Sequence, residues 1–450
     1  MRTEVKEQAP RAIVAAVQLP SVSDLEFESS LAELRELART LGFKVVSTFV
    51  QKRNSFDTTG YLGIGKRQEL ASYINGQVGF DEVDGSPLAL ETEAGEIDMI
   101  LVDHEISPSQ ARNLEIEVGC EVMDRTMVIL EIFHRNARSR AAKAQVEIAR
   151  LGYMAPRLRE AARLAGSQGR QRSGVGGRGS GESHTELDRR KIRDRIAELQ
   201  LEIVAMEAER KTQRARRQER QGLAGVALVG YTNAGKSTLM RALTGSEVLV
   251  ENKLFATLDT TVRALYPESV PRVLVSDTVG FIKNLPHGLV ASFKSTLDEA
   301  LDASLLLHVI DASDPGFERQ REVTDTVLEE IEANDIPRLR IFNKIDFVGD
   351  AAAQAECKAN LEAQYPDCIV MSARNPEEVA RLHRIIVDFF QRDLVETELF
   401  LPWSAQQGRG DIYASCAVIE ERADEAGAFF RVRGEAHVIE ALRERFVGLS

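Results

Sequence analysis

The sequence predicts a multidomain α/β protein: a small α/β domain, a long antiparallel helical hairpin, a larger α/β domain and a small C-terminal α/β domain. Three observations predict this arrangement. The chain has 450 residues, which is too many for one ordinary hydrophobic core. Strand-like and helix-like runs alternate in the first part of the chain and again beyond residue 222. Between these two parts, from about Arg135, the pattern is that of two long helices.

Composition excludes several classes of protein. Hydrophobic residues make up 43% of the chain and charged residues 28%, as in a globular rather than a disordered protein. No apolar run reaches the ~18 residues of a membrane span, and the N-terminal segment MRTEVKEQAP lacks the apolar core of a secretion signal. The four cysteines (Cys120, Cys357, Cys368 and Cys416) lack CxxC spacing, which is typical of a reduced compartment without a structural metal. We expect a monomeric cytoplasmic protein without membrane association.

Residues 1–134 are predicted to form the first α/β domain, with a mostly parallel sheet. Strand-like runs occupy Ala12–Leu19, Lys44–Gln51 and Ile97–Ile106. Helices that open on a serine cap are predicted over Ser23–Thr40 and from Ser107 onward.

Residues 135–221 are predicted to form a basic, coiled-coil-like helical hairpin. One helix begins at Asn136, a glycine-rich loop follows it, and a second long helix begins near His184. In the second helix, apolar residues recur at spacings of four and three, which predicts a packing seam. These residues are Ile192, Ile196, Leu199, Ile203 and Met206.

The hairpin differs in charge from the rest of the chain. The formal net charge of the whole chain is −13, yet His134–Gln221 contains 22 Lys and Arg against 11 Asp and Glu. Of those 22 cations 19 are arginine, whose planar guanidinium suits phosphate contacts. The surplus indicates a contact with nucleic acid. A solvated helical face with its own acidic partners is the alternative.

Residues 222–395 are predicted to form the third domain, which opens with the strand Gly225–Gly230, and residues 396–450 the small C-terminal domain. In the C-terminal domain, strands are predicted over Asp411–Arg422 and Gly427–Gly434, followed by a helix. The sequence assigns no chemistry to this last domain.

The segment that follows the strand Gly225–Gly230 fits the phosphate-loop pattern GxxxxGK[ST]. Its residues are Gly230, Tyr231, Thr232, Asn233, Ala234, Gly235, Lys236 and Ser237. A buried strand precedes the loop and a helix follows it, the setting in which backbone amides face phosphates. We predict that Lys236 reaches the β- and γ-phosphates and that the Ser237 hydroxyl holds Mg²⁺.

Three further motifs stand at predicted strand ends, in the order that a GTPase requires. They are Asp277-Thr278-Val279-Gly280, Asn343-Lys344-Ile345-Asp346 and Ser372-Ala373-Arg374. Asp277 is predicted to hold Mg²⁺ through water, and the Gly280 N–H to contact the γ-phosphate. The Asp346 carboxylate can accept two hydrogen bonds from guanine, whereas adenine would leave it unpaired.

Asn343, Lys344 and Ala373 are predicted to complete the base site, with the Ala373 N–H meeting the guanine O6. Together these motifs predict a P-loop GTPase domain that hydrolyses GTP to GDP with Mg²⁺.

A switch loop must lie between the phosphate loop and Asp277. The residues there are Phe255, Ala256, Thr257, Leu258, Asp259, Thr260 and Thr261. One threonine should bind Mg²⁺ when the γ-phosphate is present. We predict Thr257, with the pair Thr260 and Thr261 as the alternative.

Two positions bear on the rate of hydrolysis. Phe281 follows Gly280, where many GTPases place a glutamine that orients the attacking water. An apolar ring cannot orient water, so we predict slow intrinsic hydrolysis that a partner stimulates. Asn233 stands where some GTPases coordinate a potassium ion. Potassium activation and a plain loop-shaping role for Asn233 both stay open.

Beyond these motifs the sequence resembles the HflX family, a branch of the Obg-like translation GTPases, over roughly residues 40–390. The segments that resemble it include SPSQARNLE, EVMDRTMVILEIF, AKAQVEIARLGYMAPRL, LFATLDTT and DTVGFIKNLPHGLVASFKSTLDEAL. The resemblance supports Thr257 as the switch threonine. It implies binding to the large ribosomal subunit through the hairpin, and separation of stalled or idle ribosomes under stress. It implies no DNA partner. Where the family has a GPGETQLE-like stretch, this chain has GSGESHTE.

Two other functions stay open from the residues. The turn Gly60–Lys66 also fits GxxxxGK, but Arg67 replaces the hydroxyl residue that would bind magnesium. An RNA-remodelling NTPase could use ATP there, with GTP as a regulator. A third alternative is a protein that binds ribosomes or RNA regardless of nucleotide.

Overall fold

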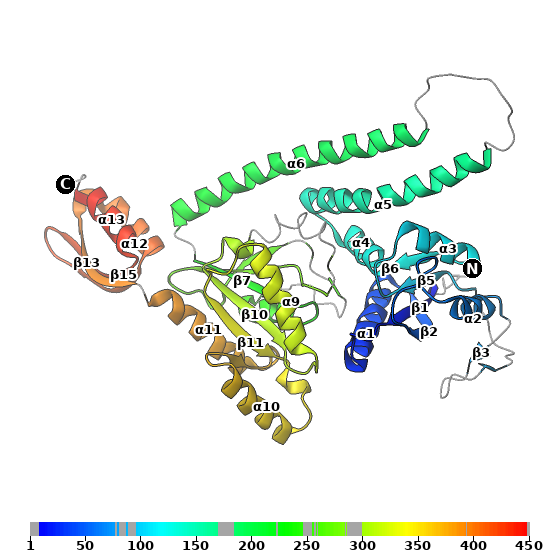
Figure 1. Ribbon diagram of the computed structural model, residues 1–450. Helices are drawn as coiled ribbons and strands as arrows, with labels where there is room; N and C mark the ends of the chain where they lie inside the picture. Colours follow the sequence, from blue (N-terminus) through cyan, green and yellow to red (C-terminus); the bar gives the residue numbers. More distant parts are fainter. Residues whose placement is uncertain are drawn as a thin grey trace, which may run out of the picture. The chain divides into compact units, whose positions relative to one another are not determined.

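The computed structural model describes residues 9–76, 79–80, 87–88, 96–169, 184–221, 224–245, 254–255, 258, 260–283, 285, 299–392 and 394–447 (Figure 1). The chain forms two compact units. The N-terminal unit contains Met1–Val204 together with Asn252–Leu258 and Asn284–Phe293. The second unit, which we call the nucleotide unit, contains Ala205–Glu251, Asp259–Lys283 and Lys294–Ser450.

The N-terminal unit is built on a parallel sheet of four strands in the order β2-β1-β5-β6. The strands are β1 (Arg11–Gln18), β2 (Lys44–Lys52), β5 (Met99–Val102) and β6 (Val122–Asp124). The helices that connect or follow them are α1 (Asp24–Leu41), α2 (Ile64–Ile74), α3 (Pro108–Val118) and α4 (Arg125–Asn136). Two short strands, β3 (Gly79–Phe80) and β4 (Pro87–Leu88), pair separately. A strand buried on both faces is uniformly apolar, which explains the run from Ala12 to Val17 in β1.

Side chains at the helix termini explain where the helices of this unit begin. Ser23 caps α1 by accepting a hydrogen bond from the Glu26 N–H. Ser107 caps α3 and forms a capping box with Gln110, in which each side chain bonds the other residue's backbone. Both serine caps agree with the sequence prediction.

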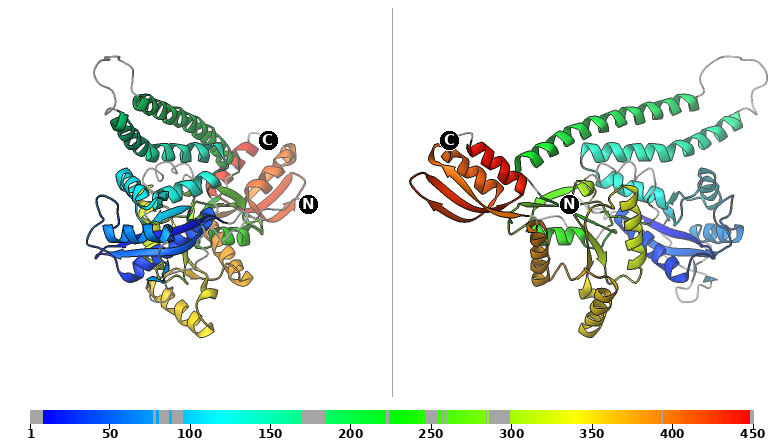
Figure 2. Two further views of the ribbon diagram at one scale, coloured as in Figure 1. Left: turned by 90° about the vertical axis from the view of Figure 1, so that its right-hand side faces the viewer. Right: turned by 60° about the vertical axis from the view of Figure 1, so that its left-hand side comes forward.

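Two long helices, α5 (Arg140–Gly169) and α6 (His184–Gln221), run antiparallel (Figures 1 and 2). Arg195 on α6 bonds Glu147 on α5 with an N–O distance of 2.9 Å. Leu199 is buried, and the other predicted seam residues of α6 are half-buried. Glu198, Gln200 and Leu201, which stand next to the seam, are exposed. The seam pattern therefore describes the face on which α6 packs.

The nucleotide unit is built on a six-stranded sheet in the order β12-β11-β10-β7-β9-β8, parallel except for β8. The strands are β7 (Ala224–Gly230), β8 (Thr261–Ala264), β9 (Val273–Asp277), β10 (Leu305–Asp311), β11 (Arg338–Asn343) and β12 (Ile369–Val370). The helices are α7 (Lys236–Thr244), α9 (Phe317–Glu330), α10 (Ala351–Gln364) and α11 (Pro376–Gln391), with the 3-10 turn η1 (Ile345–Phe347).

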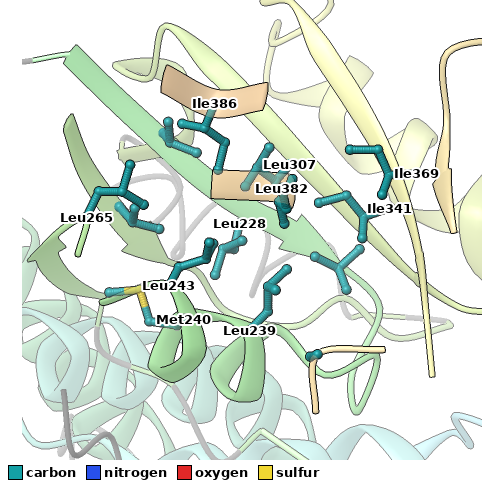
Figure 3. Close-up of a cluster of buried hydrophobic side chains, with 14 of the residues drawn as sticks. Leu228, Leu239, Met240, Leu243, Leu265, Leu307, Ile341, Ile369, Leu382 and Ile386 are labelled. Carbon is teal, nitrogen blue, oxygen red and sulfur yellow. The ribbon is translucent and has the colours of Figure 1, made fainter. Parts of the chain in front are cut away.

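The main core of this sheet lies between its strands and the helices α7 and α11. Figure 3 shows Leu239 and Leu243 of α7 and Leu382 of α11 among side chains of the central strands, such as Leu228 and Leu307. A second cluster under α9 covers the other face. Close packing on both faces fixes the strand ends, and the loops at those ends carry the motifs.

A small antiparallel sheet of order β13-β15-β14 follows, with the helices α12 (Arg409–Ser415) and α13 (Ala436–Val447) and the 3-10 segment η2 (Trp403–Gly408). Its strands are β13 (Val395–Pro402), β14 (Ala417–Ala423) and β15 (Gly427–Gly434). The prediction of a strand over Asp411–Arg422 is wrong in its first part, because Arg409–Ser415 is helical. Ile412 of that helix is buried in the core of the C-terminal sheet.

The predicted fold class is confirmed: a P-loop GTPase domain follows a small α/β domain and a helical hairpin, and precedes a small α/β domain. Among the described residues, no helix combines the length and the hydrophobicity that a bilayer crossing requires.

Candidate nucleotide-binding site

The phosphate loop connects β7 to α7 and depends on two glycines. Gly230 has φ +147°, and a Cβ at this position would lie 2.2 Å from the Val309 carbonyl oxygen. Gly235 has φ +97°, and a Cβ there would lie 2.2 Å from the Asn343 side-chain nitrogen. Because backbone and side-chain atoms approach so closely, only glycine fits at either position.

Lys236 opens α7 with its ammonium group buried inside the loop. The Nζ donates to the Gly230 carbonyl over 3.1 Å and to the Tyr231 carbonyl over 2.7 Å. The pKa of Lys236 is lowered to about 8, mainly by burial, while the Asp277 carboxylate opposes this shift and the positive charge of Lys344 adds to it. A cation in this position is suited to the phosphates of a nucleotide.

Ser237 and Asp277 meet at the other side of the loop. The Ser237 hydroxyl donates to an Asp277 carboxylate oxygen over 2.7 Å, and Asp277 is fully buried at the end of β9. The next residue, Thr278, donates from its hydroxyl to the Leu228 carbonyl over 2.7 Å, which ties the end of β9 to β7. Hydroxyl and carboxylate oxygens are the donors that Mg²⁺ prefers, so this pair fits a magnesium ion.

Phe281 lies beside the phosphate loop but faces away from it. Its backbone forms a bridge with Tyr231: the Thr232 N–H donates to the Phe281 carbonyl over 2.7 Å, and the Phe281 N–H donates to the Gly230 carbonyl over 3.1 Å. The ring is only 2% exposed and belongs to the apolar cluster under α9. The loop after Gly280 is therefore hydrogen-bonded to the phosphate loop, with its aromatic side chain in the core.

Gly280 itself is in close contact with the phosphate loop. A Cβ on Gly280 would lie 2.9 Å from the Lys236 Nζ and 2.9 Å from the Thr232 Cα. The glycine is needed here because a side chain would collide with the loop backbone.

Asn343 connects the phosphate loop to the segment Ser372-Ala373-Arg374. Its Nδ2 donates to the Ala234 carbonyl over 2.9 Å, and its Oδ1 accepts from the Ala373 N–H over 2.9 Å. The predicted base-binding residues thus meet at the carboxyl ends of β11 and β12. Arg374 lies 3.8 Å from Asp346 and over the Phe347 ring, 4.9 Å from its centroid.

Two side chains that the sequence did not single out support this end of the site. Asp311, at the end of β10, binds the Lys344 ammonium over 2.7 Å. The Glu378 carboxylate accepts from the Ser372 N–H over 2.6 Å. Asp311 ends a strand and Glu378 lies in the first turn of α11, but only the tertiary fold shows which motif each of them contacts.

The predicted switch residues are described only in part. Ala256, Thr257 and Asp259 lie outside the described residues. Phe255 and Leu258 belong to the N-terminal unit, where they are 3% and 2% exposed. Within the nucleotide unit, the structure gathers the phosphate-loop, Asp277–Gly280, Asn343–Asp346 and Ser372–Arg374 motifs, and the role of Phe255 and Leu258 stays a prediction.

The second GxxxxGK stretch has a different geometry. Tyr61 is fully buried, and its hydroxyl lies 2.8 Å from Nδ1 of His104. The buried Arg67 guanidinium donates to the Leu62 carbonyl and pairs with Asp57 and Glu117. The Arg67 guanidinium therefore packs against this turn at Gly60 and Leu62, whereas the interior of a phosphate loop is open to an anion.

Family models match most of the chain. The match described as GTP-binding GTPase N-terminal covers residues 28–134, that described as GTP-binding GTPase Middle Region covers residues 136–217, and that described as 50S ribosome-binding GTPase covers residues 225–344. The chain is 48% identical to the GTPase HflX of Gluconacetobacter diazotrophicus over 98% of both chains. It is 35% identical to the GTPase HflX of Escherichia coli over 93% of this chain and 92% of that protein.

The chain belongs to the HflX family of GTPases. As an HflX GTPase it hydrolyses GTP, in a P-loop domain that begins at β7. Among solved structures, it is similar to a GTP-binding protein of the archaeon Sulfolobus solfataricus in complex with GDP, with 23% identity and a TM-score of 0.44 over 84% of this chain and 99% of that chain. The family is one of ribosome-binding GTPases.

Proposed function

We propose that this HflX GTPase binds the large ribosomal subunit in a manner controlled by GTP, and that it separates stalled or idle ribosomes under stress. The observation that carries the proposal is the convergence of Lys236, the Ser237–Asp277 pair and the Asn343–Ala373 bond at one edge of the sheet. These groups suit the phosphates, the metal and the base of one nucleotide, in that order along the site.

At the phosphate end, Lys236 binds the β- and γ-phosphates, and the backbone of Gly230–Ser237 donates to their oxygens. Ser237 and Asp277 would hold Mg²⁺, Asp277 through water, and Thr257 would join them when the γ-phosphate is present. Bound Mg²⁺ neutralises charge that develops on the phosphates during hydrolysis. The Gly280 N–H contacts the γ-phosphate, and its closeness to Lys236 supports that role. Potassium at Asn233 would add a further positive charge.

At the base end, Asp346 accepts from the guanine N1–H and exocyclic amine, and Lys344 lies over the ring. The Asp311 bond to Lys344 supports this placement, because it holds the ammonium beside the base site. The Ala373 N–H already points at a carbonyl-type acceptor, the Asn343 Oδ1, which agrees with a role at the guanine O6.

The ribosome is bound through the basic hairpin. Exposed cations along α6 include Arg189, Lys191 and Arg193, and the arginine surplus of residues 134–221 favours a phosphate backbone as the partner. GTP orders the switch loop and thereby sets the affinity for the ribosome.

The test is the single-turnover GTP hydrolysis rate with and without purified large ribosomal subunits, in potassium and in sodium buffer. Stimulation of at least about a hundredfold by the subunits is expected. In parallel, the protein is sedimented with ribosomes in the presence of a GTP analogue, GDP or no nucleotide. Equal sedimentation in the three states would overturn control by GTP, and an unchanged hydrolysis rate would overturn the ribosome as the stimulating partner.

A further inference from the structure

We infer that the surface formed by Thr40 of α1 and by Phe133 and Asn136 of α4 is a docking site for the α7–β8 loop, and that this docking competes with GTP. The inference rests on the proposed role of that loop as a switch. If the loop docks there, the N-terminal unit influences whether the protein binds GTP or GDP more tightly.

The loop segment is bonded to the N-terminal unit through both backbone and side chains. The Asn136 Nδ2 donates to the Phe255 carbonyl over 2.8 Å, and the Leu254 N–H donates to the Thr40 hydroxyl over 3.3 Å. The Phe255 and Phe133 rings meet edge to face, with centroids 4.5 Å apart. Edge-to-face aromatic pairs of this kind stabilise a contact beyond the burial of their area.

The burial of this segment is that of a core rather than of a surface loop. Leu254 is 7% exposed, and Phe255 and Leu258 are less exposed still. Loops ordinarily run over the surface, and apolar loop side chains are buried only when another element covers them. Asn252–Leu258 therefore belongs to the N-terminal unit, although the chain on either side of it belongs to the nucleotide unit.

The backbone of Phe255 is strained in the docked position. Its φ of 57° is in the left-handed region, which bulky side chains rarely adopt. Such a conformation persists only where the surroundings determine it, and it is typical of clamps and switch regions. The contacts with Phe133 and Asn136 supply those surroundings.

Chain connectivity links the docking site to the nucleotide site. The loop leaves α7, whose first turn carries Lys236 and Ser237, and it returns in β8, where Thr261 pairs with Asp277. Thr257, the predicted magnesium ligand, lies between the docked residues Phe255 and Leu258. Capture of that stretch by Mg²⁺ and the γ-phosphate must therefore act on the docked residues. Since GDP lacks the γ-phosphate, only GTP competes with docking.

Linkage then requires that the effect be reciprocal: whatever weakens docking raises the affinity for GTP relative to GDP. The helix that carries Phe133 and Asn136 leads directly into the hairpin along the chain, because α4 ends at Asn136 and α5 begins at Arg140.

The experiment measures dissociation constants of GDP and of a non-hydrolysable GTP analogue for the full chain. The decisive variants are Asn136→Ala and Phe133→Leu, because both residues lie in the N-terminal unit, outside the nucleotide-binding residues. We expect each to increase the preference for the GTP analogue over GDP by at least about threefold. Phe400→Ala, which removes a half-exposed ring from the C-terminal sheet, is the matched control and should leave the preference unchanged.

Hydrogen exchange of α4 in the wild-type chain gives a second readout. The amides of residues 125–136 should exchange faster with the GTP analogue than with GDP, and Asn136→Ala should reduce that difference. An unchanged nucleotide preference in both variants, or equal exchange with the two nucleotides, would overturn docking. If the wild-type chain bound no guanine nucleotide at all, the proposed function would fail first, so the two failures are distinguishable.

Discussion

Asp346 is the residue on which base recognition depends most directly. It lies at the end of the Asn343–Asp346 motif, beside Arg374. Asp346→Asn replaces a carboxylate with an amide that can donate to a carbonyl. We expect affinity for GTP to fall by at least about a hundredfold, and xanthosine triphosphate to be preferred over GTP, because xanthine offers an oxygen where guanine carries an amine. Competition binding with the two triphosphates measures this, and unaltered preference would contradict the assignment.

Phe281 occupies the position at which many GTPases carry a catalytic glutamine, yet we expect a glutamine there not to raise the hydrolysis rate. Replacing it with glutamine would restore the residue that many GTPases use, yet position 281 faces the core under α9. We expect Phe281→Gln to leave the intrinsic hydrolysis rate unchanged and to lower the free energy of unfolding by about 2 to 4 kcal/mol, because an amide is buried where a ring packed.

Phe281→Leu is the control for this change. It keeps the side chain apolar and should cost less than about 1.5 kcal/mol. Single-turnover hydrolysis and urea unfolding distinguish the two variants. A faster intrinsic rate in Phe281→Gln would show that the side chain can turn toward the phosphates.

Among single residues, the sequence could predict those whose role depends on local backbone geometry. The glycines of the phosphate loop, Lys236 and Ser237 stand in one local pattern, and close contacts exclude a side chain at Gly230 and Gly235. Asp311 and Glu378 could not be predicted, since their partners Lys344 and Ser372 are brought to them only by the packing of neighbouring strands and helices.

At the scale of secondary-structure elements, β10 contains a buried histidine that makes stability depend on pH. Burial first, and then the charges of Arg338 and Arg340, lower the pKa of His308 to about 3. The unfolded chain, with an ordinary pKa near 6.5, binds a proton that the folded chain does not. The free energy of unfolding should therefore fall by about 1.4 kcal/mol per pH unit as the pH drops below 6.5.

Urea unfolding at pH 7 and pH 5 checks this dependence, with a loss of about 2 kcal/mol expected from this group. His308→Val should remove most of that loss, whereas His134→Gln, at an exposed position on α4, should retain it. An equal loss in the wild-type chain and in His308→Val would place the acid sensitivity elsewhere.

Several elements with strong periodicity were predicted correctly, whereas a segment with a misleading composition was not. The first hairpin helix, predicted to begin at Asn136, begins at Arg140, because Asn136 ends α4. The strands of the nucleotide unit and the caps of α1 and α3 follow from apolar runs and serine positions. The segment Arg409–Ser415 contains Ile412 and Tyr413, which favour strands, yet it forms α12. Ion pairing of Arg409 with Glu421 and the bond from the Tyr413 hydroxyl to Glu421 anchor the helix from outside, so tertiary contacts override propensity.

At the scale of the whole molecule, the charge of the hairpin predicts how ribosome binding responds to salt. Each phosphate contact releases counterions, so affinity should fall steeply between 50 and 200 mM salt, by about tenfold or more. The double variant Arg189→Gln and Arg193→Gln should weaken binding and reduce the salt slope by about two. Arg422→Gln, in the C-terminal sheet, is the control. Sedimentation with large subunits at several salt concentrations measures the slope, and an unchanged slope would exclude these arginines from the contact.

At this scale, the sequence predicts where the switch loop lies along the chain but not which surface receives its side chains. The order of the motifs placed Phe255 and Leu258 between the phosphate loop and Asp277, and on that basis near the nucleotide. Their apolar side chains are buried, and the segment that contains them is grouped with the N-terminal unit. A motif gives the position of a loop along the chain, whereas the surface that receives its side chains is set by residues more than a hundred positions away.

The buried ring at position 281 has a consequence for timing. Because no side chain at this position can orient water, we expect a bound GTP to be exchanged with the surrounding nucleotide pool more often than it is cleaved. We then expect occupancy by GTP or GDP to follow the ratio of the two nucleotides in the cell rather than the rate of intrinsic hydrolysis. Between encounters with its partner, the nucleotide bound to the protein would therefore reflect the relative supply of GTP and GDP. Each encounter would stimulate hydrolysis and return the protein to its GDP-bound form.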